Sequence, residues 1–174
     1  MMQPEKEYAK ALFLVSEERG GEDYLPYLRQ LRDILREEPA YSRMMISPAI
    51  SLREKKALIL EAFSSMPQPV TSLLQILCDN DRFALLGDVI NEYEALVRAA
   101  EGRAEAKIAS AIPLTEAQKA AVIARLEAKL GKRLDPVFSV DPGLIGGIRA
   151  EVEGVTFDGT VKKTLSEAKD VMIG

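Results

Sequence analysis

The spacing of apolar residues changes near residue 102, and this change constrains the fold more than any other feature of the chain. Up to Arg103, apolar residues recur at intervals of three and four, as in helices that bury one face. From Ala104 onward, short alternating runs typical of strands are mixed with helical segments. Four of the 11 glycines lie in the first part and seven in the second. We therefore predict two domains, residues 1–103 and residues 104–174.

Six short helices are expected in the first domain. Breakers at residues 20–21, 39, 48, 67–69, 79–81 and 102 divide its apolar stripes into six segments. The fourth segment opens with Ser51-Leu52-Arg53-Glu54, a capping box whose side chains satisfy free backbone N–H groups at a helix start. Six amphipathic segments of this length predict a six-helix bundle.

The second domain is expected to be a small mixed α/β unit. Alternation predicts a strand over 104–112, and Thr115-Glu116-Ala117-Gln118 is a second capping box that opens a helix ending at Gly131. Short strands are expected near 137–140, 148–152 and 155–157, followed by a last helix over 161–172. The fold class is therefore α+β and mostly α, with a sheet packed against two helices.

Composition excludes several classes of function. The 174 residues contain no His and one Cys, so His-based catalytic triads, His-ligated metals and internal disulfides are excluded. The net charge of −4 and the lack of a basic tract argue against a nucleic-acid partner. No apolar stretch is long enough to span a membrane, and the first residues lack the pattern of a signal peptide. We expect a cytosolic protein without catalytic residues, metal or cofactor, and without membrane insertion.

The loop Asp79-Asn80-Asp81 resembles the start of a calcium-binding loop. Counting from Asp79, Ala84 stands where that loop needs glycine and Ile90 stands where it needs a bidentate glutamate. We therefore interpret it as a polar turn between two helices, in which Asp79 and Asp81 could orient Arg82.

The densest glycine cluster is Asp141-Pro142-Gly143-Leu144-Ile145-Gly146-Gly147-Ile148. It matches neither phosphate-binding fingerprint, and the residues after it alternate as a strand where an anion site needs a helix N-terminus. A small enzyme that binds a phosphate ligand around Gly143–Gly147 nevertheless remains the alternative to a non-catalytic function. The structural interpretation is a close backbone approach where the chain enters a strand.

The first and fifth helical segments carry more apolar residues than one buried face requires. The surplus is spread over residues 8–13 and 70–78. Such stripes ordinarily form core, but the excess could line a groove for a partner helix.

Four segments resemble the delta subunit family of F-type ATP synthase, which includes the mitochondrial oligomycin sensitivity-conferring protein. They are Tyr8–Phe13, Leu73–Phe83, Val140–Ile148 and Phe157–Val161, and the resemblance runs through the whole chain in order. The family signature falls on Asp141, Leu144, Ile145, Gly146, Gly147, Asp158 and Gly159.

The resemblance implies a non-catalytic stator subunit for ATP synthesis and proton transport. It implies one copy per complex, on the cytoplasmic side of the cell membrane, which joins the catalytic head to the peripheral stalk. The first domain would bind the amino-terminal helix of an alpha subunit, and the second would bind the b subunits. Groove residues carried over from the resemblance are Tyr8, Ala11, Leu12, Val15, Val70, Leu74, Leu77 and Cys78. On this assignment Leu74→Asp should weaken alpha binding and leave the helices intact. A helical adaptor unrelated to ATP synthesis is the remaining alternative.

Overall fold

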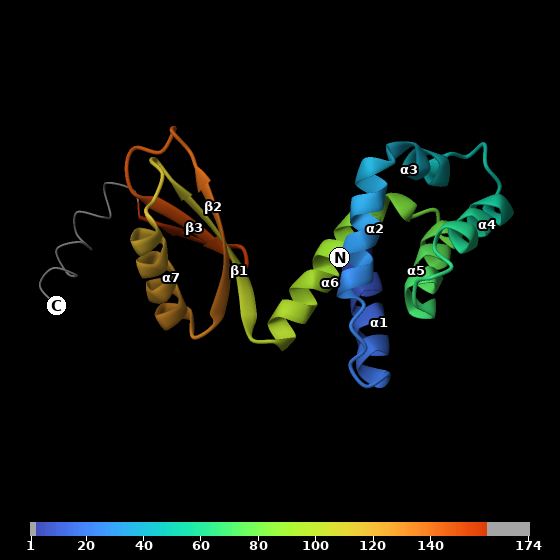
Figure 1. Cartoon of the computed structure of the whole chain (residues 1–174), viewed down its shortest axis with the longest axis horizontal. Helices are drawn as coiled ribbons and strands as arrows, with labels where there is room; N and C mark the ends of the chain where they lie inside the picture. The colour runs from blue at the N-terminus through green and yellow to red at the C-terminus, as the bar shows by residue number, and fades with distance from the viewer. Residues whose placement is uncertain (1–2, 160–174) are drawn as a thin grey trace, which may run out of the picture. The chain divides into compact units, whose positions relative to one another are not determined.

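A computed structural model describes residues 3–159 and divides the chain into two compact units, residues 1–97 and 98–174 (Figure 1). This division falls six residues before the boundary predicted from composition. The reason is that helix α6 (Leu86–Ala100) continues past Val97, so the change of unit occurs inside a helix and not at the glycine that follows it.

The first unit is helical, and its helices begin and end close to the predicted breakers. Besides α6, its elements are α1 (Pro4–Glu18), α2 (Leu25–Glu37), α3 (Pro39–Ile46), α4 (Leu52–Ala62), α5 (Gln68–Asp79) and a 3₁₀ turn over Phe83–Leu85. Both capping boxes are present: Ser51 Oγ accepts from the Glu54 N–H at 3.3 Å, and Thr115 Oγ1 accepts from the Gln118 N–H at 3.2 Å. Local capping chemistry therefore sets these two helix starts.

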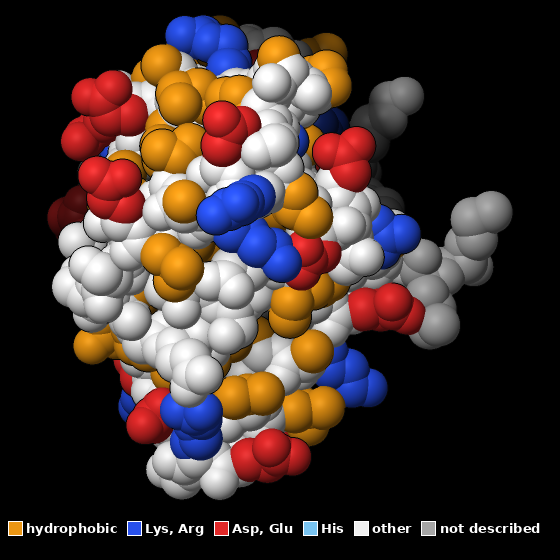
Figure 2. Space-filling model, turned by 90° about the vertical axis from the view of Figure 1, so that its right-hand side faces the viewer, with side chains coloured by type: hydrophobic (Ala, Val, Ile, Leu, Met, Phe, Trp, Pro, Cys, Tyr) orange, Lys and Arg blue, Asp and Glu red, His pale blue; other side chains and the backbone are white. Residues whose placement is uncertain are grey.

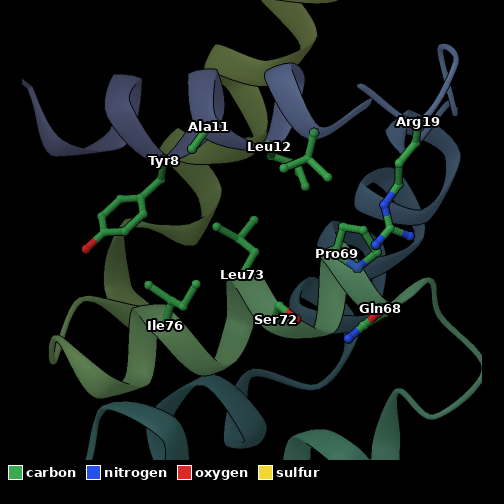
Figure 3. Close-up of a pocket in the computed structure, with 10 residues that line it drawn as sticks. Tyr8, Ala11, Leu12, Arg19, Gln68, Pro69, Ser72, Leu73 and Ile76 are labelled. Atoms are coloured by element: carbon green, nitrogen blue, oxygen red, sulfur yellow. The ribbon is translucent and has the colours of Figure 1, made fainter. Parts of the chain in front are cut away.

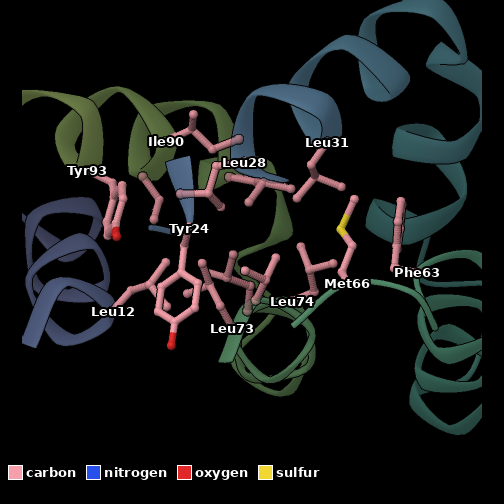
Figure 4. Packing of buried hydrophobic residues seen from close by; sticks show 14 of the residues in the cluster. Leu12, Tyr24, Leu28, Leu31, Phe63, Met66, Leu73, Leu74, Ile90 and Tyr93 are labelled. Atoms are coloured by element: carbon pink, nitrogen blue, oxygen red, sulfur yellow. The ribbon is translucent and has the colours of Figure 1, made fainter. Parts of the chain in front are cut away.

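Large apolar side chains from all six of these α-helices meet in one core, part of which Figure 4 shows. Leu28 and Leu31 of α2, Leu74 of α5 and Ile90 of α6 are all 0% exposed. The Phe13 and Tyr93 rings pack edge to face with centroids 6.2 Å apart, which links α1 to α6. Burial of these stripes, more than helix propensity, holds such short helices in place.

An ion pair between a buried glutamate and two half-exposed arginines connects α2 with α6. Glu94 has a side chain only 10% exposed, and its two carboxylate oxygens lie 2.7 Å from Arg29 Nε and 3.2 Å from Arg32 Nη1. Burial raises the pKa of the Glu94 carboxyl, but the hydrogen bond from Arg29 and the charge of Arg32 outweigh burial. The pKa of Glu94 therefore lies below its usual value.

We expect Glu94→Gln to lower the free energy of unfolding by about 1–2 kcal/mol at neutral pH, because the neutral amide has one acceptor oxygen where the carboxylate offers one to each arginine. The pKa of Glu94 is lower in the folded chain than in the unfolded chain, where a glutamate has a pKa of about 4.3. Ionised Glu94 therefore stabilises the fold above that pH, and this stabilisation is lost as the pH falls. Urea unfolding across pH should therefore show the difference shrinking below about pH 4. Asp33→Asn is the control, because its pair with Arg36 at 3.3 Å is exposed and should contribute under about 0.5 kcal/mol. Equal effects of the two substitutions would contradict the assignment.

The second unit is a mixed sheet with one helix on one face. Its elements are β1 (Arg103–Ser110), α7 (Glu116–Leu130), β2 (Arg133–Val140), β3 (Ile148–Val152) and β4 (Val155–Asp158), with strand order β2-β1-β3-β4. β1 pairs in parallel with β2 and antiparallel with β3. Within residues 3–159 the fold is thus α+β and mostly helical, with seven α-helices. The last predicted helix, over 161–172, lies outside the described residues.

The predicted alternation decides which sheet face is buried. Ala104, Ala106 and Ile108 of β1 are at most 3% exposed and pack with Ile123 and Leu126 of α7. β2 begins four residues earlier than predicted, although Pro136 cannot donate a backbone hydrogen bond. An edge strand tolerates that loss, and β2 is an edge of this sheet.

The glycine-rich segment carries the chain across the end of β1. Ser110, the last residue of β1, pairs with Val140 on one side and with Ile148 on the other, so residues 141–147 must pass over the strand end. The Asp141 N–H donates to the Ser110 carbonyl at 2.8 Å, and Gly146 and Gly147 have φ of 67° and 81°. Glycine adopts this left-handed backbone at little cost, which explains the two consecutive glycines.

Gly159 follows β4 and lies at the same end of the sheet, beside the first residue of β3. Its N–H donates to the Ile148 carbonyl at 2.8 Å, and an added Cβ would lie 3.0 Å from that oxygen. We expect Gly159→Ala to lower the free energy of unfolding by about 1–2 kcal/mol, because the backbone must move away. Gly87→Ala in α6 is the matched control: nothing lies within 4 Å of an added Cβ there, so urea unfolding should show unchanged or slightly higher stability. Identical midpoints for both variants would remove the close-approach explanation.

Candidate helix-binding groove

A hollow of about 270 Å³ lies between α1 and α5 (Figure 3). Its walls are mainly apolar, and the two helices run in opposite directions along it, with Tyr8 opposite Ile76 at one end and Arg19 near Gln68 at the other. The lining residues are Tyr8, Ala11, Leu12, Val15, Arg19, Gln68, Pro69, Ser72, Leu73 and Ile76. The shape is an elongated apolar groove with polar ends.

All four residues predicted on the α1 side line this groove. Tyr8, Ala11, Leu12 and Val15 recur at three- and four-residue spacing, so they share one face of α1. Leu12 is 5% exposed and belongs also to the core, whereas Ala11 is exposed. On α1 the core stripe and the groove wall are therefore adjacent.

On α5 the residues predicted for the groove differ from those that line the hollow. Val70, Leu74 and Leu77 are 0% exposed and Cys78 is 7% exposed, and none of the four lines the groove. They form the stripe at i, i+4, i+7 and i+8 that α5 turns toward the core. α5 is apolar on two faces, and spacing alone does not determine which face turns inward.

The groove face of α5 carries Gln68, Pro69, Ser72, Leu73 and Ile76. One sequence signal marks it: Ile76 is a large apolar residue that the stripe of Val70, Leu74 and Leu77 does not include, and it is 46% exposed. Arg19 and Gln68 carry no such signal, because polar residues at helix ends are common on any surface.

Exposed apolar side chains also occur outside the groove. Leu52 and Leu60 of α4 are 44% and 53% exposed, and Figure 2 shows hydrophobic side chains interleaved with charged ones on one face of the molecule. Single exposed apolar residues are normal for proteins. Exposed apolar side chains alone therefore do not identify a site. The groove is the candidate site because its apolar side chains line a concave surface between α1 and α5.

The glycine-rich loop is poorly suited to a phosphate. The N–H groups of Asp141, Gly143, Leu144 and Gly146 all donate to acceptors within the protein, the Gly143 N–H to Asp141 Oδ1 at 2.9 Å. A phosphate cradle needs such groups free and converging. Within residues 3–159 there is also no group of three or more carboxylate, His or Cys side chains that could hold a metal ion.

Cys78 is a core residue. Burial raises the pKa of its thiol, so the neutral form is retained at physiological pH. Residues 3–159 include no helix with the length and hydropathy needed to cross a bilayer.

Together, the fold and the groove define a class of protein: a two-unit scaffold whose helical part presents an apolar groove. The family model for ATP synthase delta (OSCP) subunits matches residues 5–172, so the chain belongs to this family. It is accordingly a non-catalytic subunit of ATP synthase and a component of its peripheral stalk, and it takes part in ATP synthesis and proton transport through that complex.

Similar proteins from bacteria support this assignment over nearly the full chain. ATP synthase subunit delta of Geobacillus sp. (strain WCH70) is 32% identical over 171 residues, covering 97% of this chain and 96% of the relative. ATP synthase subunit delta of Burkholderia pseudomallei (strain 1710b) is 34% identical over 165 residues, covering 91% and 90%.

A similar fold occurs in a solved structure. A chain in the cryo-EM structure of the Toxoplasma gondii mitochondrial ATP synthase hexamer superposes with a TM-score of 0.71, covering 99% of both chains at 20% identity. At this identity the similarity concerns the fold alone.

Proposed function

We propose that the groove between α1 and α5 holds the amino-terminal amphipathic helix of an alpha subunit, with α1–α6 acting as one six-helix bundle. The observation that carries this proposal is the exposed apolar wall of the groove. Ile76 is 46% exposed beside Leu73 and Ala11, an arrangement that leaves apolar surface in water until a partner covers it.

An apolar groove suits a static connector. A peripheral stalk must hold the catalytic head against the torque of the rotor for many turns, so the contact must be long-lived. Burial of apolar area stabilises the contact by roughly 25 cal/mol per Å² before ordering costs, and it needs no chemical step. This function requires no catalytic group in the groove.

Titration calorimetry of the full chain with a synthetic peptide of the alpha subunit's amino-terminal segment tests this proposal. We expect binding with a negative heat-capacity change, the signature of apolar burial. Absence of binding by the folded chain would refute the groove assignment while the family membership stands.

We further propose that the second unit contacts the b subunits at the end of its sheet near Ser110. Ile145 of the glycine-rich loop is 83% exposed, Ile112 67% and Val140 50%. Val140 and Ile112 lie near Ser110, because Val140 is its register partner and the Ile112 carbonyl accepts from the Ser110 hydroxyl at 2.6 Å. Ile145 belongs to the loop that crosses this end of the sheet. This apolar cluster gives the glycine-rich signature a second role besides crossing the strand end.

Chemical cross-linking from cysteine introduced at position 145 to a peptide of the b subunit's carboxyl-terminal segment tests the second contact. The serine variant Cys78→Ser serves as background so that the new thiol is the only one. We expect cross-links from position 145 and none from a cysteine at Leu60, and the reverse pattern would refute the assignment. With both contacts, a single copy would bridge head and stalk, on the cytoplasmic side of the membrane in a bacterial complex.

A further inference from the structure

A polar cluster is attached to the groove through Tyr8, which lines one end of it. Tyr8 lines the groove, and its phenol oxygen accepts hydrogen bonds from Asn80 Nδ2 at 3.0 Å and Arg82 Nη1 at 3.3 Å. The guanidinium carbon of Arg82 lies 6.0 Å from the centroid of the Tyr8 ring. We call Tyr8, Asn80 and Arg82 the Tyr8 cluster.

The turn after α5 places Arg82 there. The Asp81 N–H donates to the Cys78 carbonyl at 3.0 Å and the Arg82 N–H donates to the Leu77 carbonyl at 2.7 Å, which is the hydrogen-bond pattern of a Schellman motif. Asp81 has φ of 54°, a left-handed backbone that usually belongs to glycine. The polar loop singled out in the sequence therefore turns Arg82 back toward α1.

Among the described residues, the charge of Arg82 has no carboxylate partner. Asp79 precedes it, but Asp79 Oδ1 lies 2.6 Å from Lys56 Nζ. Across residues 3–159 no Asp or Glu forms an ion pair with Arg82, and the Tyr8 hydroxyl, which accepts two hydrogen bonds, donates its own hydrogen to no described group. Two donors at the groove end, a guanidinium and a phenol O–H, thus remain available for an acceptor-only group.

We propose that the Tyr8 cluster is a polar anchor that binds a carboxylate side chain of the helix docked in the groove and so sets the register of that helix. This inference rests on the proposed function of the groove. Burial of apolar surface is not directional, so a purely apolar groove would let a helix slide by one turn. A charge-assisted hydrogen bond at one end removes that freedom, because only one register brings the carboxylate to Arg82.

Arg19 at the opposite end provides the matched control. It lines the same groove and carries the same charge, but its side chain forms no hydrogen bond or ion pair with the described residues. Arg82 is held in place by Tyr8 before any partner arrives, whereas Arg19 is not. Preorganisation of this kind lowers the cost of binding.

Double-mutant cycles in titration calorimetry test the anchor. The full chain, as wild type, Arg82→Gln, Tyr8→Phe and Arg19→Gln, is titrated with the alpha amino-terminal peptide. The same titrations are repeated with peptides in which each Asp or Glu is replaced singly by its amide. We expect Arg82→Gln to raise Kd about tenfold at low salt, less at high salt, and to remove the effect of one particular amide replacement. Tyr8→Phe should couple to that same peptide position, and Arg19→Gln should not.

The possible outcomes separate the two proposals. Tight wild-type binding with purely additive effects at every peptide position would overturn the anchor and leave the groove assignment intact. Equal coupling of Arg19 and Arg82 to the same carboxylate would also overturn it, because the effect would then be general charge attraction. No binding of any peptide by the wild type would refute groove and anchor together. Urea unfolding of each variant checks that a weakened affinity does not come from a damaged fold.

Discussion

Leu74→Asp is expected to unfold the helical unit, lowering its free energy of unfolding by at least about 4 kcal/mol. Leu74 is 0% exposed and packs in the core beneath the groove (Figure 4). The substitution removes a buried apolar side chain and puts a carboxylate among the apolar side chains of the core. Because small domains are stable by only about 5–15 kcal/mol, this loss should be visible as a fall in helical content by far-UV circular dichroism.

Two further substitutions at the same position show whether burial is the cause. Leu74→Met conserves volume and should cost less than about 1.5 kcal/mol, and Leu74→Ala should cost about 2–5 kcal/mol. A folded Leu74→Asp variant with the wild-type urea midpoint would contradict this expectation. It would return Leu74 to the groove, where the family resemblance implies that it lies.

Ile76→Asp is expected to leave the fold intact and to weaken binding of the alpha amino-terminal peptide at least thirtyfold, about 2 kcal/mol. Ile76 lies two residues from Leu74 on α5, but it is 46% exposed on the groove wall (Figure 3). A carboxylate there costs little in the free chain because water reaches it. In the complex the same carboxylate would be buried against an apolar helix without a partner.

Leu60→Asp is the control for Ile76→Asp. Leu60 on α4 is 53% exposed and does not line the groove, so the same change of chemistry should alter neither stability nor affinity. Calorimetry measures both variants against one peptide. Wild-type affinity for Ile76→Asp, or an equal loss for Leu60→Asp, would show that the partner does not bind between α1 and α5.

These two expectations reverse the one derived from the sequence, in which Leu74→Asp weakens binding and preserves the helices. The reversal depends only on which face of α5 is buried. The same comparison separates a stability defect from a binding defect, because Leu74 and Ile76 differ in burial while sharing a helix.

Several features of the fold could be predicted because their causes are local. The capping boxes at Ser51 and Thr115 mark helix starts through hydrogen bonds that span only three residues. The alternation of Ala104, Ala106 and Ile108 against Glu105 and Lys107 predicts the buried face of β1 for the same reason. The dense glycines of residues 141–147 likewise marked a segment with unusual backbone. Only the strand order shows that this segment passes over the end of β1 to connect β2 with β3.

Other features depend on residues far apart in the sequence, so no local pattern contains them. The ion pair of Glu94 with Arg29 and Arg32 spans more than 60 residues, and nothing near Glu94 distinguishes it from the solvated acids of neighbouring helices. The contact of Arg82 with Tyr8 spans 74 residues and depends on the left-handed turn at Asp81.

The sequence by itself determined that the chain has a helical part and a mixed part, where most helices begin and end, and which family it resembles. The four α1 residues that the family resemblance implied for a groove, Tyr8, Ala11, Leu12 and Val15, are also residues that line the hollow in the structure. Only the tertiary structure decided the wall on α5. Helical periodicity shows that a face is apolar, but apolar burial has no direction of its own, so the neighbouring helices determine which of two apolar faces enters the core and which remains for a partner.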